Sequence, residues 1–304
     1  MNLQPRHIAW IAVDWGTTHL RVYAMSAGGD VLDEASSSDG MAGLNRDDFE
    51  PALLRLIEPW LNAGIMQVLA CGMVGARQGW VEAPYNSVPC TTDGNTPIKI
   101  ECQDKRIQVF IVPGIKQPQP ADVMRGEETQ IAGFLEQQPD FDGVICLPGT
   151  HTKWAHISAK EIVSFRTFMT GEMFGLVSEH SVLRHSVSGQ GWDDIAFLNA
   201  VDETLSRPEV LAAKLFSIRA DSLLNNQENT LARAKLSGYL IGAELAGAKP
   251  YWLGQPIVII GATNLVKNYQ SALLAQGAET RIVEGAEMTL LGLTAARNAL
   301  AVTV

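Results

Sequence analysis

The sequence has no run of basic residues, no paired spacing of cysteines and no apolar stretch that approaches the length of a membrane span. With a net charge of -10, the chain is not expected to bind nucleic acid, because it offers no basic run to release counterions from phosphates. The four cysteines favour a reduced, cytoplasmic compartment over a disulfide framework or a zinc site: Cys71, Cys90, Cys102 and Cys146. The segment from Met1 to Arg6 is too short and too polar for a signal peptide, so no membrane partner is expected.

The remaining composition is typical of a globular protein. The chain is 46% apolar and 18% charged, as in ordinary globular proteins. Its length of 304 residues is enough for two domains, each with a core of its own. Two prolines between Lys116 and Pro120 indicate a hinge or a surface loop. We therefore expect an N-terminal α/β domain over residues 1–120 and a C-terminal α/β domain over residues 121–304, in a monomer or a homodimer.

Hydrophobic periodicity predicts a mixed sheet faced by helices. Strands are expected at residues 8–14, 20–25, 31–35, 67–72, 107–113, 143–147, 155–158, 162–168, 256–261 and 281–283. Helices are expected at residues 46–62, 122–137, 265–276 and 286–300, and over most of 199–246. Small residues recur every four positions within this last segment and predict close helix packing: Ala234, Gly238, Gly242 and Ala246.

The string DWGTTHLR follows the first predicted strand and has the composition of a phosphate-binding turn. Gly16 allows the backbone to approach a ligand closely, and Thr17 and Thr18 offer hydroxyl and N–H groups to an anion. Arg21 adds planar, bidentate donors, and Asp14 is placed to hold Mg²⁺ through waters. The alternative interpretation is a β-hairpin turn with exposed threonines.

A similar arrangement returns after the strand predicted at residues 143–147, in the string LPGTHTKW. Gly149, Thr150 and Thr152 repeat the glycine–threonine chemistry, which predicts two related halves that each give one phosphate loop to a shared cleft. Lys153 and His151 would add a positive charge and a hydrogen-bond donor. Two unrelated hairpins, with Lys153 on a solvated face and His151 facing solvent, remain the alternative.

Six strings together resemble the sugar kinase, heat-shock chaperone and actin superfamily, and within it the 2-dehydro-3-deoxygalactonokinases: DWGTTHLR, ACGMVGARQGW, RGEETQ, LPGTHTKW, FMTGE and VIIGATN. The resemblance covers nearly the whole chain. It implies two ribonuclease H-like (actin-like ATPase) domains with a nucleotide cleft between them. It also implies phosphorylation of 2-dehydro-3-deoxy-D-galactonate by ATP and Mg²⁺ at the terminal hydroxyl, in galactonate catabolism.

The resemblance also implies a general base in RGEETQ, where relatives similar to glycerol kinase carry a Gly-Asp-Gln sequence. Glu127 is the best candidate, and Glu128 stays open beside it, because this chain has Glu, one methylene longer, where the relatives have Asp. A sugar hydroxyl that attacks a phosphate needs such a carboxylate to accept its proton. The alternative is that the two carboxylates only favour the start of a helix.

Further site residues follow from the other strings. Arg77 is the first choice for the carboxylate of a sugar acid and Arg166 the second, because an anionic substrate needs a cation or several N–H donors. Gln78 stands where many polyol kinases have Glu, and Glu172 belongs to a lid or to the far wall of the site. In VIIGATN, the adenosine is expected beside two residues, Gly261 and Asn264.

Three other functions remain open at this stage. The first is a kinase of the same fold for another sugar acid or polyol. The second is an actin-like or chaperone-like ATPase that changes shape rather than phosphorylating a small molecule, and the third is a phosphatase of the same fold.

Overall fold

The computed structural model describes residues 7–62, 64–92, 96–189 and 191–302. The chain divides into two compact units. Unit 1 comprises the segments Met1–Phe141, Ser158–Ser164 and Gly285–Val304, and unit 2 comprises Asp142–Ile157 and Phe165–Glu284.

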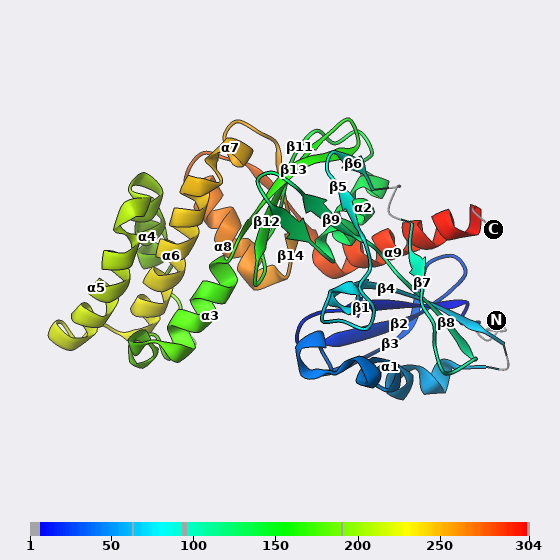
Figure 1. The fold of residues 1–304 in the computed structure, drawn as a ribbon. Coiled ribbons are helices and arrows are strands. Elements are labelled where there is room, and N and C mark those ends of the chain that lie inside the picture. The colour runs from blue at the N-terminus through cyan, green and yellow to red at the C-terminus, as the bar shows by residue number, and fades with distance from the viewer. Residues whose placement is uncertain (1–6, 63, 93–95, 190, 303–304) are drawn as a thin grey trace, which may run out of the picture. The chain divides into compact units, whose positions relative to one another are not determined.

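Unit 1 is built on a mixed sheet with the strand order β3-β2-β1-β4-β8-β7 (Figure 1). Its strands are β1 (Trp10–Trp15), β2 (Leu20–Met25), β3 (Val31–Ser37), β4 (Met66–Gly72), β7 (Ile98–Lys99) and β8 (Ile107–Ile111). A smaller sheet, ordered β10-β9-β5, contains β5 (Tyr85–Ser87), β9 (Gly114–Gln117) and β10 (Asp122–Met124). The short strand β6 (Cys90–Thr91) pairs with Glu161 and Ile162. The helices are α1 (Phe49–Ile57), α2 (Glu127–Gln137) and α9 (Gly285–Val302).

Alternation along β1 gives unit 1 a core on each face of its main sheet. Ile11 and Val13 belong to the cluster that includes Phe49 of α1, and Trp10 belongs to the cluster that includes Leu293 of α9. The red helix α9 therefore lies on the opposite face of the blue strands from α1 (Figure 1). Each of these fully buried side chains contributes about 1.5–3 kcal/mol by leaving water.

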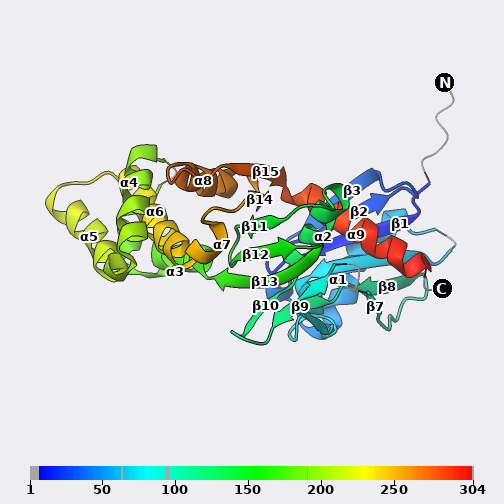
Figure 2. The same ribbon diagram turned by 90° about the horizontal axis from the view of Figure 1, so that it is seen from above.

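Unit 2 has the strand order β15-β14-β11-β12-β13. The strands are β11 (Gly143–Leu147), β12 (Thr152–Ser158), β13 (Glu161–Phe168), β14 (Ile257–Gly261) and β15 (Thr280–Glu284). The helices are α3 (Thr170–His180), α4 (Asp194–Ser206), α5 (Leu211–Leu224), α6 (Asn229–Gly247), α7 (Lys249–Trp252) and α8 (Thr263–Leu274). Figure 2 shows α8 alongside β14 and β15, where Val266 and Tyr269 join the core that contains Val144.

The small residues of α6 let two helices approach closely, as predicted. A Cβ on Gly238 would collide with the Phe197 carbonyl oxygen of α4, and one on Gly242 would collide with the Val201 carbonyl oxygen. The buried side chain of Leu245 joins the same core as these α4 residues. The predicted close packing within this helical segment is confirmed.

The two sheets repeat one topology, which confirms the expected internal repeat and the fold class. In unit 1, β1 pairs with β2 antiparallel and with β4 parallel, and β4 pairs with β8 parallel. In unit 2, β11 pairs with β12 antiparallel and with β14 parallel, and β14 pairs with β15 parallel. Each unit thus carries a ribonuclease H-like sheet, in which a glycine–threonine turn joins the first two strands.

The expectation that most of residues 199–246 is helical is confirmed: the segment belongs to three helices, of which the first two are separated at Pro208. Two other expectations differ from the structure. The helix predicted over residues 122–137 begins only at Glu127, because Gly126 has a φ of +106° and residues 122–124 form β10. The two units do not follow residues 1–120 and 121–304, because α2 packs against α9 and α9 packs on the sheet of unit 1.

Candidate functional site

In unit 1, the candidate residues gather where parallel strands end. Asp14 of β1 lies opposite Cys71 of β4 in a parallel pair, and both strands end within one residue of these positions. The carboxyl ends of parallel strands are the usual position for ligand sites in α/β proteins. The strand order therefore brings the first predicted phosphate turn to the edge of the sheet where ligand sites usually lie.

The carboxylate of Asp14 is paired within its own hairpin. Arg21 Nη1 donates to Asp14 Oδ2 over 3.0 Å, and the two residues are direct cross-strand partners in β1 and β2. Burial raises the pKa of Asp14, and the Arg21 guanidinium partly offsets that effect. The Asp14 side chain is nevertheless 26% exposed, so a ligand can reach it.

The turn itself is held by its backbone and leaves its side chains exposed. Met41 N–H donates to the Gly16 carbonyl oxygen, and Ala42 N–H donates to the Thr17 carbonyl oxygen, each over 3.0 Å. Thr17 and Thr18 are both exposed. The exposure is compatible with both interpretations of the turn, a phosphate loop and a hairpin with surface threonines.

The two glutamates at the start of α2 have different environments. Glu127 is half-buried, and its Oε2 accepts a hydrogen bond of 3.0 Å from the Arg125 backbone N–H. Glu128 is 0% exposed and accepts hydrogen bonds from the Gly126 N–H at 2.6 Å and the Thr129 hydroxyl at 3.1 Å. Burial, followed by the neighbouring Glu127 charge, raises the pKa of Glu128 to about 7. Only Glu127 is open to a ligand from outside the chain.

Arg77 and Gln78 lie in a tight turn after β4, and both side chains are exposed. The turn backbone is fixed, because Trp80 N–H donates to the Val74 carbonyl oxygen over 2.9 Å and Arg46 Nη2 donates to the Arg77 carbonyl oxygen over 3.1 Å. The arginine and the amide therefore project from a rigid segment of unit 1.

Arg125 is a candidate that the sequence analysis did not single out. It is 8% exposed, its Nη2 donates to the Ala83 carbonyl oxygen over 2.8 Å, and its guanidinium lies 4.2 Å from the centre of the Tyr85 ring. Among the described residues, its Nε and Nη1 have no hydrogen-bond partner. Its position two residues before Glu127 was the available signal, but burial of an arginine cannot be read from a single motif.

In unit 2, the second glycine–threonine turn packs directly on the start of α3. Glu172 N–H donates to the Thr150 carbonyl oxygen over 2.9 Å, and His151 Nε2 is hydrogen-bonded to Glu172 Oε2. A Cβ on Gly171 would collide with the Gly149 carbonyl oxygen, so only glycine allows this approach. The strings LPGTHTKW and FMTGE thus form one local structure.

The remaining predicted residues of unit 2 have mixed positions. Thr152 is 0% exposed and Lys153 is 4% exposed, with Lys153 Nζ donating to the His151 carbonyl oxygen over 3.2 Å. The alternative of Lys153 on a solvated face is therefore wrong, because β12 lies between β11 and β13 and its first four residues, which alternate between the two faces of the sheet, are all buried. Arg166 is exposed on β13.

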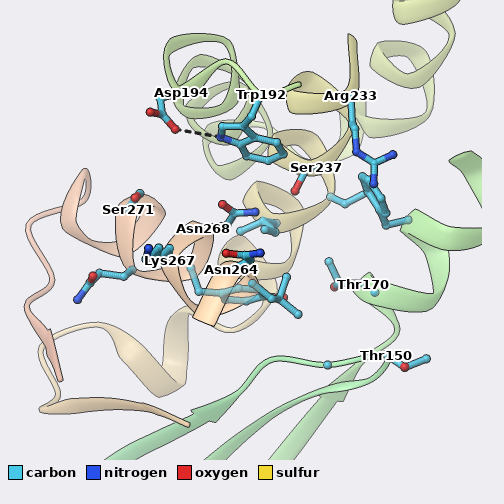
Figure 3. Close-up of a pocket in the computed structure, with 18 residues that line it drawn as sticks. Thr150, Thr170, Trp192, Asp194, Arg233, Ser237, Asn264, Lys267, Asn268 and Ser271 are labelled. Atoms are coloured by element: carbon cyan, nitrogen blue, oxygen red, sulfur yellow. Dashed lines mark hydrogen bonds between the residues drawn. The ribbon is translucent and has the colours of Figure 1, made fainter. Parts of the chain in front are cut away.

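A pocket of about 950 Å³ lies in unit 2, between the second turn and the helices α3, α4, α6 and α8 (Figure 3). It is lined by Gly149, Thr150, Thr170, Gly171, Phe174, Trp192, Asp194, Arg233, Ser237, Leu240, Ile241, Asn264, Leu265, Lys267, Asn268, Tyr269, Gln270 and Ser271. The predicted Asn264 is among these residues, whereas Gly261 is not. Most of the helical residues were missed by sequence reasoning, because no spacing connects four helices that are distant in the chain.

The pocket combines apolar side chains with many hydroxyl, amide and charged groups. Trp192 Nε1 donates to Asp194 Oδ1 over 2.9 Å, and the Arg233 guanidinium lies 4.9 Å from the centre of the Phe174 ring. Figure 3 shows Asn264 and Asn268 on one side of the pocket, and Thr150 at its lower edge. Such a site suits a planar, partly polar ligand whose anionic end lies at the turn.

Within the described part of the chain, no helix is long and apolar enough to cross a membrane. Nor do three or more His, Cys, Asp or Glu side chains gather there in an arrangement that could hold a metal ion.

Comparison with known proteins gives consistent matches over nearly the full length. The model of the 2-keto-3-deoxy-galactonokinase family matches residues 14–296. A probable 2-dehydro-3-deoxygalactonokinase of Rhizobium meliloti (strain 1021) is 35% identical over 96% of this chain and 97% of its own length. The 2-dehydro-3-deoxygalactonokinase of Escherichia coli (strain K12) is 32% identical over 96% of this chain and 98% of its own length.

A solved structure agrees with these sequence matches. The crystal structure of a candidate 2-dehydro-3-deoxygalactonokinase from Sinorhizobium meliloti superposes with a TM-score of 0.87 at 35% identity, covering 96% of this chain and 99% of the other. The match therefore includes both glycine–threonine turns and the start of α2. The chain belongs to the 2-keto-3-deoxy-galactonokinase family.

Proposed function

We propose that this chain transfers the terminal phosphate of ATP to 2-dehydro-3-deoxy-D-galactonate, at its terminal hydroxyl, giving the 6-phosphate. The observation that carries the proposal is the pocket of unit 2, which opens on Gly149 and Thr150 of a glycine–threonine turn. Its mixture of apolar and hydrogen-bonding side chains suits a nucleoside, and the turn suits phosphates. The acceptor is inferred from the family and from the names of the two relatives.

Asp14 is the residue that we propose for Mg²⁺. Arg21 occupies its Oδ2, and no hydrogen bond from the described residues reaches its Oδ1. A partly exposed carboxylate oxygen is the hard ligand that Mg²⁺ prefers, and sites of this kind often use one or two carboxylates together with substrate phosphates. When bound, the metal would neutralise charge on the phosphates.

Glu127 is the proposed general base. Its Oε2 is held by the Arg125 N–H, and its half-buried carboxylate is accessible to a hydroxyl. Accepting the hydroxyl proton frees the oxygen to attack phosphorus. Glu128 is too deeply buried for this role, and its hydrogen bonds to Gly126 and Thr129 instead fix the start of the helix.

Arg77 is the proposed ligand of the substrate carboxylate, so Arg77→Ala is expected to raise KM for the sugar acid roughly 10- to 100-fold. A hydrogen bond to a charged group contributes about 1.5–3 kcal/mol, and the change leaves the fixed turn backbone intact. KM for ATP should change little. Steady-state kinetics will measure this, with Arg55→Ala as a control, because Arg55 is an exposed arginine of the same unit that pairs with Asp39. An unchanged KM for the sugar acid in Arg77→Ala would remove Arg77 from the substrate site.

A coupled ADP-release assay tests the proposed function directly. ATP and Mg²⁺ are supplied with 2-dehydro-3-deoxygalactonate, its gluconate epimer, glycerol or no acceptor. We expect strong turnover with the galactonate compound alone. If turnover occurs only with another acceptor, that compound replaces the galactonate derivative as the proposed substrate. If phosphate is released at the same rate with every acceptor and with none, an actin-like or chaperone-like ATPase or a phosphatase is favoured.

A further inference from the structure

A buried carboxylate in unit 2 connects three segments beside the pocket, and the proposed reaction does not use it. Glu244 of α6 is 3% exposed, and it does not line the pocket. Its Oε1 accepts a hydrogen bond of 2.8 Å from Trp154 Nε1, and its Oε2 accepts one of 2.7 Å from the Tyr269 hydroxyl. The Thr170 hydroxyl also hydrogen-bonds to this carboxylate.

The network extends to the second glycine–threonine turn. Thr152 Oγ1 and the Tyr269 hydroxyl oxygen are 2.8 Å apart. Either hydroxyl can be the donor in this contact, and Thr152 also hydrogen-bonds to the Glu244 carboxyl group, so the two side chains and Glu244 form one connected network. Thr152 is also 0% exposed, so its hydroxyl serves the network rather than a phosphate.

The partners of Glu244 belong to the walls of the pocket. Tyr269 of α8 and Thr170 of α3 both line it. Thr152 starts β12 directly after the Gly149–His151 segment, and Thr170 precedes the Gly171 that contacts Gly149. One carboxyl group thus connects β12, α3 and α8, and its hydrogen bonds offset only part of the cost of burying it, because burial still raises the pKa of Glu244 to about 7.

We propose that Glu244 is a positioning residue for nucleotide binding, which acts by holding Thr152, Thr170 and Tyr269 together beneath the second glycine–threonine turn. This inference rests on the proposed use of the unit 2 pocket for ATP. Glu244 itself touches no ligand in this scheme. Its effect reaches the nucleotide through the turn and through the two pocket residues.

The test is Glu244→Gln, which keeps the size of the side chain but replaces one acceptor oxygen with a donor. Residues that orient metal ligands through hydrogen bonds typically contribute about 10- to 100-fold in affinity, and we take the same scale for a residue that orients the walls of a nucleotide pocket. We therefore expect the Kd of a non-hydrolysable ATP analogue, measured calorimetrically without acceptor, to rise about 10-fold or more. KM for ATP should rise in parallel, and KM for the sugar acid should stay within about twofold.

Two further variants keep the result interpretable. Tyr269→Phe removes only the hydroxyl that joins Glu244 to Thr152. It should also raise the Kd of the analogue, which keeps the test valid even if Glu244→Gln folds poorly. Thr204→Val is the matched control, because Thr204 is 0% exposed in the same unit, hydrogen-bonds to Ala200 and Tyr239, and does not line the pocket. It should lower Tm without changing nucleotide affinity.

The outcomes separate this inference from the proposed function. If the unsubstituted chain binds the analogue but Glu244→Gln and Tyr269→Phe bind it equally well, the positioning role is wrong while the proposed function stands. If the unsubstituted chain binds no nucleotide at all, the proposed function fails and the inference fails with it. If Thr204→Val weakened binding of the analogue as much as Glu244→Gln does, the effect of Glu244 would come from general stability, and the inference would also be overturned.

Discussion

Glu127→Gln is expected to lower kcat about 10³-fold, within the range that a general base contributes. The amide retains an oxygen that can accept the Arg125 N–H, so the start of α2 should keep its structure. It cannot accept the hydroxyl proton, which is why the loss should appear in kcat rather than in either KM. Steady-state kinetics with saturating ATP and sugar acid will measure it.

Glu128→Gln is the paired variant for this experiment. Its side chain is 0% exposed, and burial has already raised the pKa of Glu128 to about 7, so a neutral group of the same shape should be tolerated. We expect kcat to fall by less than about tenfold, far below the range for a general base. The opposite order, with Glu128→Gln inactive and Glu127→Gln active, would transfer the catalytic role to the buried glutamate.

Asp14→Asn is expected to lower kcat/KM for ATP about 10²-fold, because it removes the charge that pairs with Arg21 and the carboxylate proposed for Mg²⁺. Raising the Mg²⁺ concentration should recover part of the loss, since the metal would be held more weakly rather than excluded. The measurement is a titration of activity against Mg²⁺ at fixed ATP.

Asp39→Asn provides a closely matched control within the same unit. Asp39 accepts a hydrogen bond of 3.0 Å from Arg55 Nη2, the same length as the Arg21–Asp14 contact, and its side chain is 31% exposed compared with 26% for Asp14. Surface pairs of this type contribute about 0–1 kcal/mol, so activity should not change. A similar loss of activity in both variants would show that any broken aspartate–arginine pair in unit 1 is sufficient, and Asp14 would lose its assigned role.

The local pattern of the sequence determined most of the elements and the repeat. The strands predicted at residues 20–25 and 143–147 match β2 and β11 in both bounds. Alternating or continuous apolar residues are a local signal that depends only on which side of a strand is buried. The two glycine–threonine turns were found in the same way, because each follows its strand directly.

Local pattern was less reliable where a single residue changes the backbone. The start of α2 was placed five residues early, because residues 122–124 pair with the preceding strand β9 and because Gly126, which has a positive φ, lies close to Gly72, far away in the chain. The sequence favoured Glu127 but could not choose firmly between Glu127 and Glu128. Their different exposure depends on how α2 packs against α9, which begins about 150 residues later (the contact of Gln130 with Gly285 spans 155 positions).

By itself, then, the sequence determined the family, the repeated α/β architecture and the short motifs that carry the chemistry, since each of these depends on residues that are close in the chain. Only the tertiary structure decided which glutamate is accessible, that Thr152 and Lys153 are buried, and that four distant helices and a turn enclose one pocket. It also joined Glu244 to Trp154 and Tyr269 across 90 and 25 positions. Burial and hydrogen bonding are properties of neighbours in space, and a motif records only neighbours in sequence.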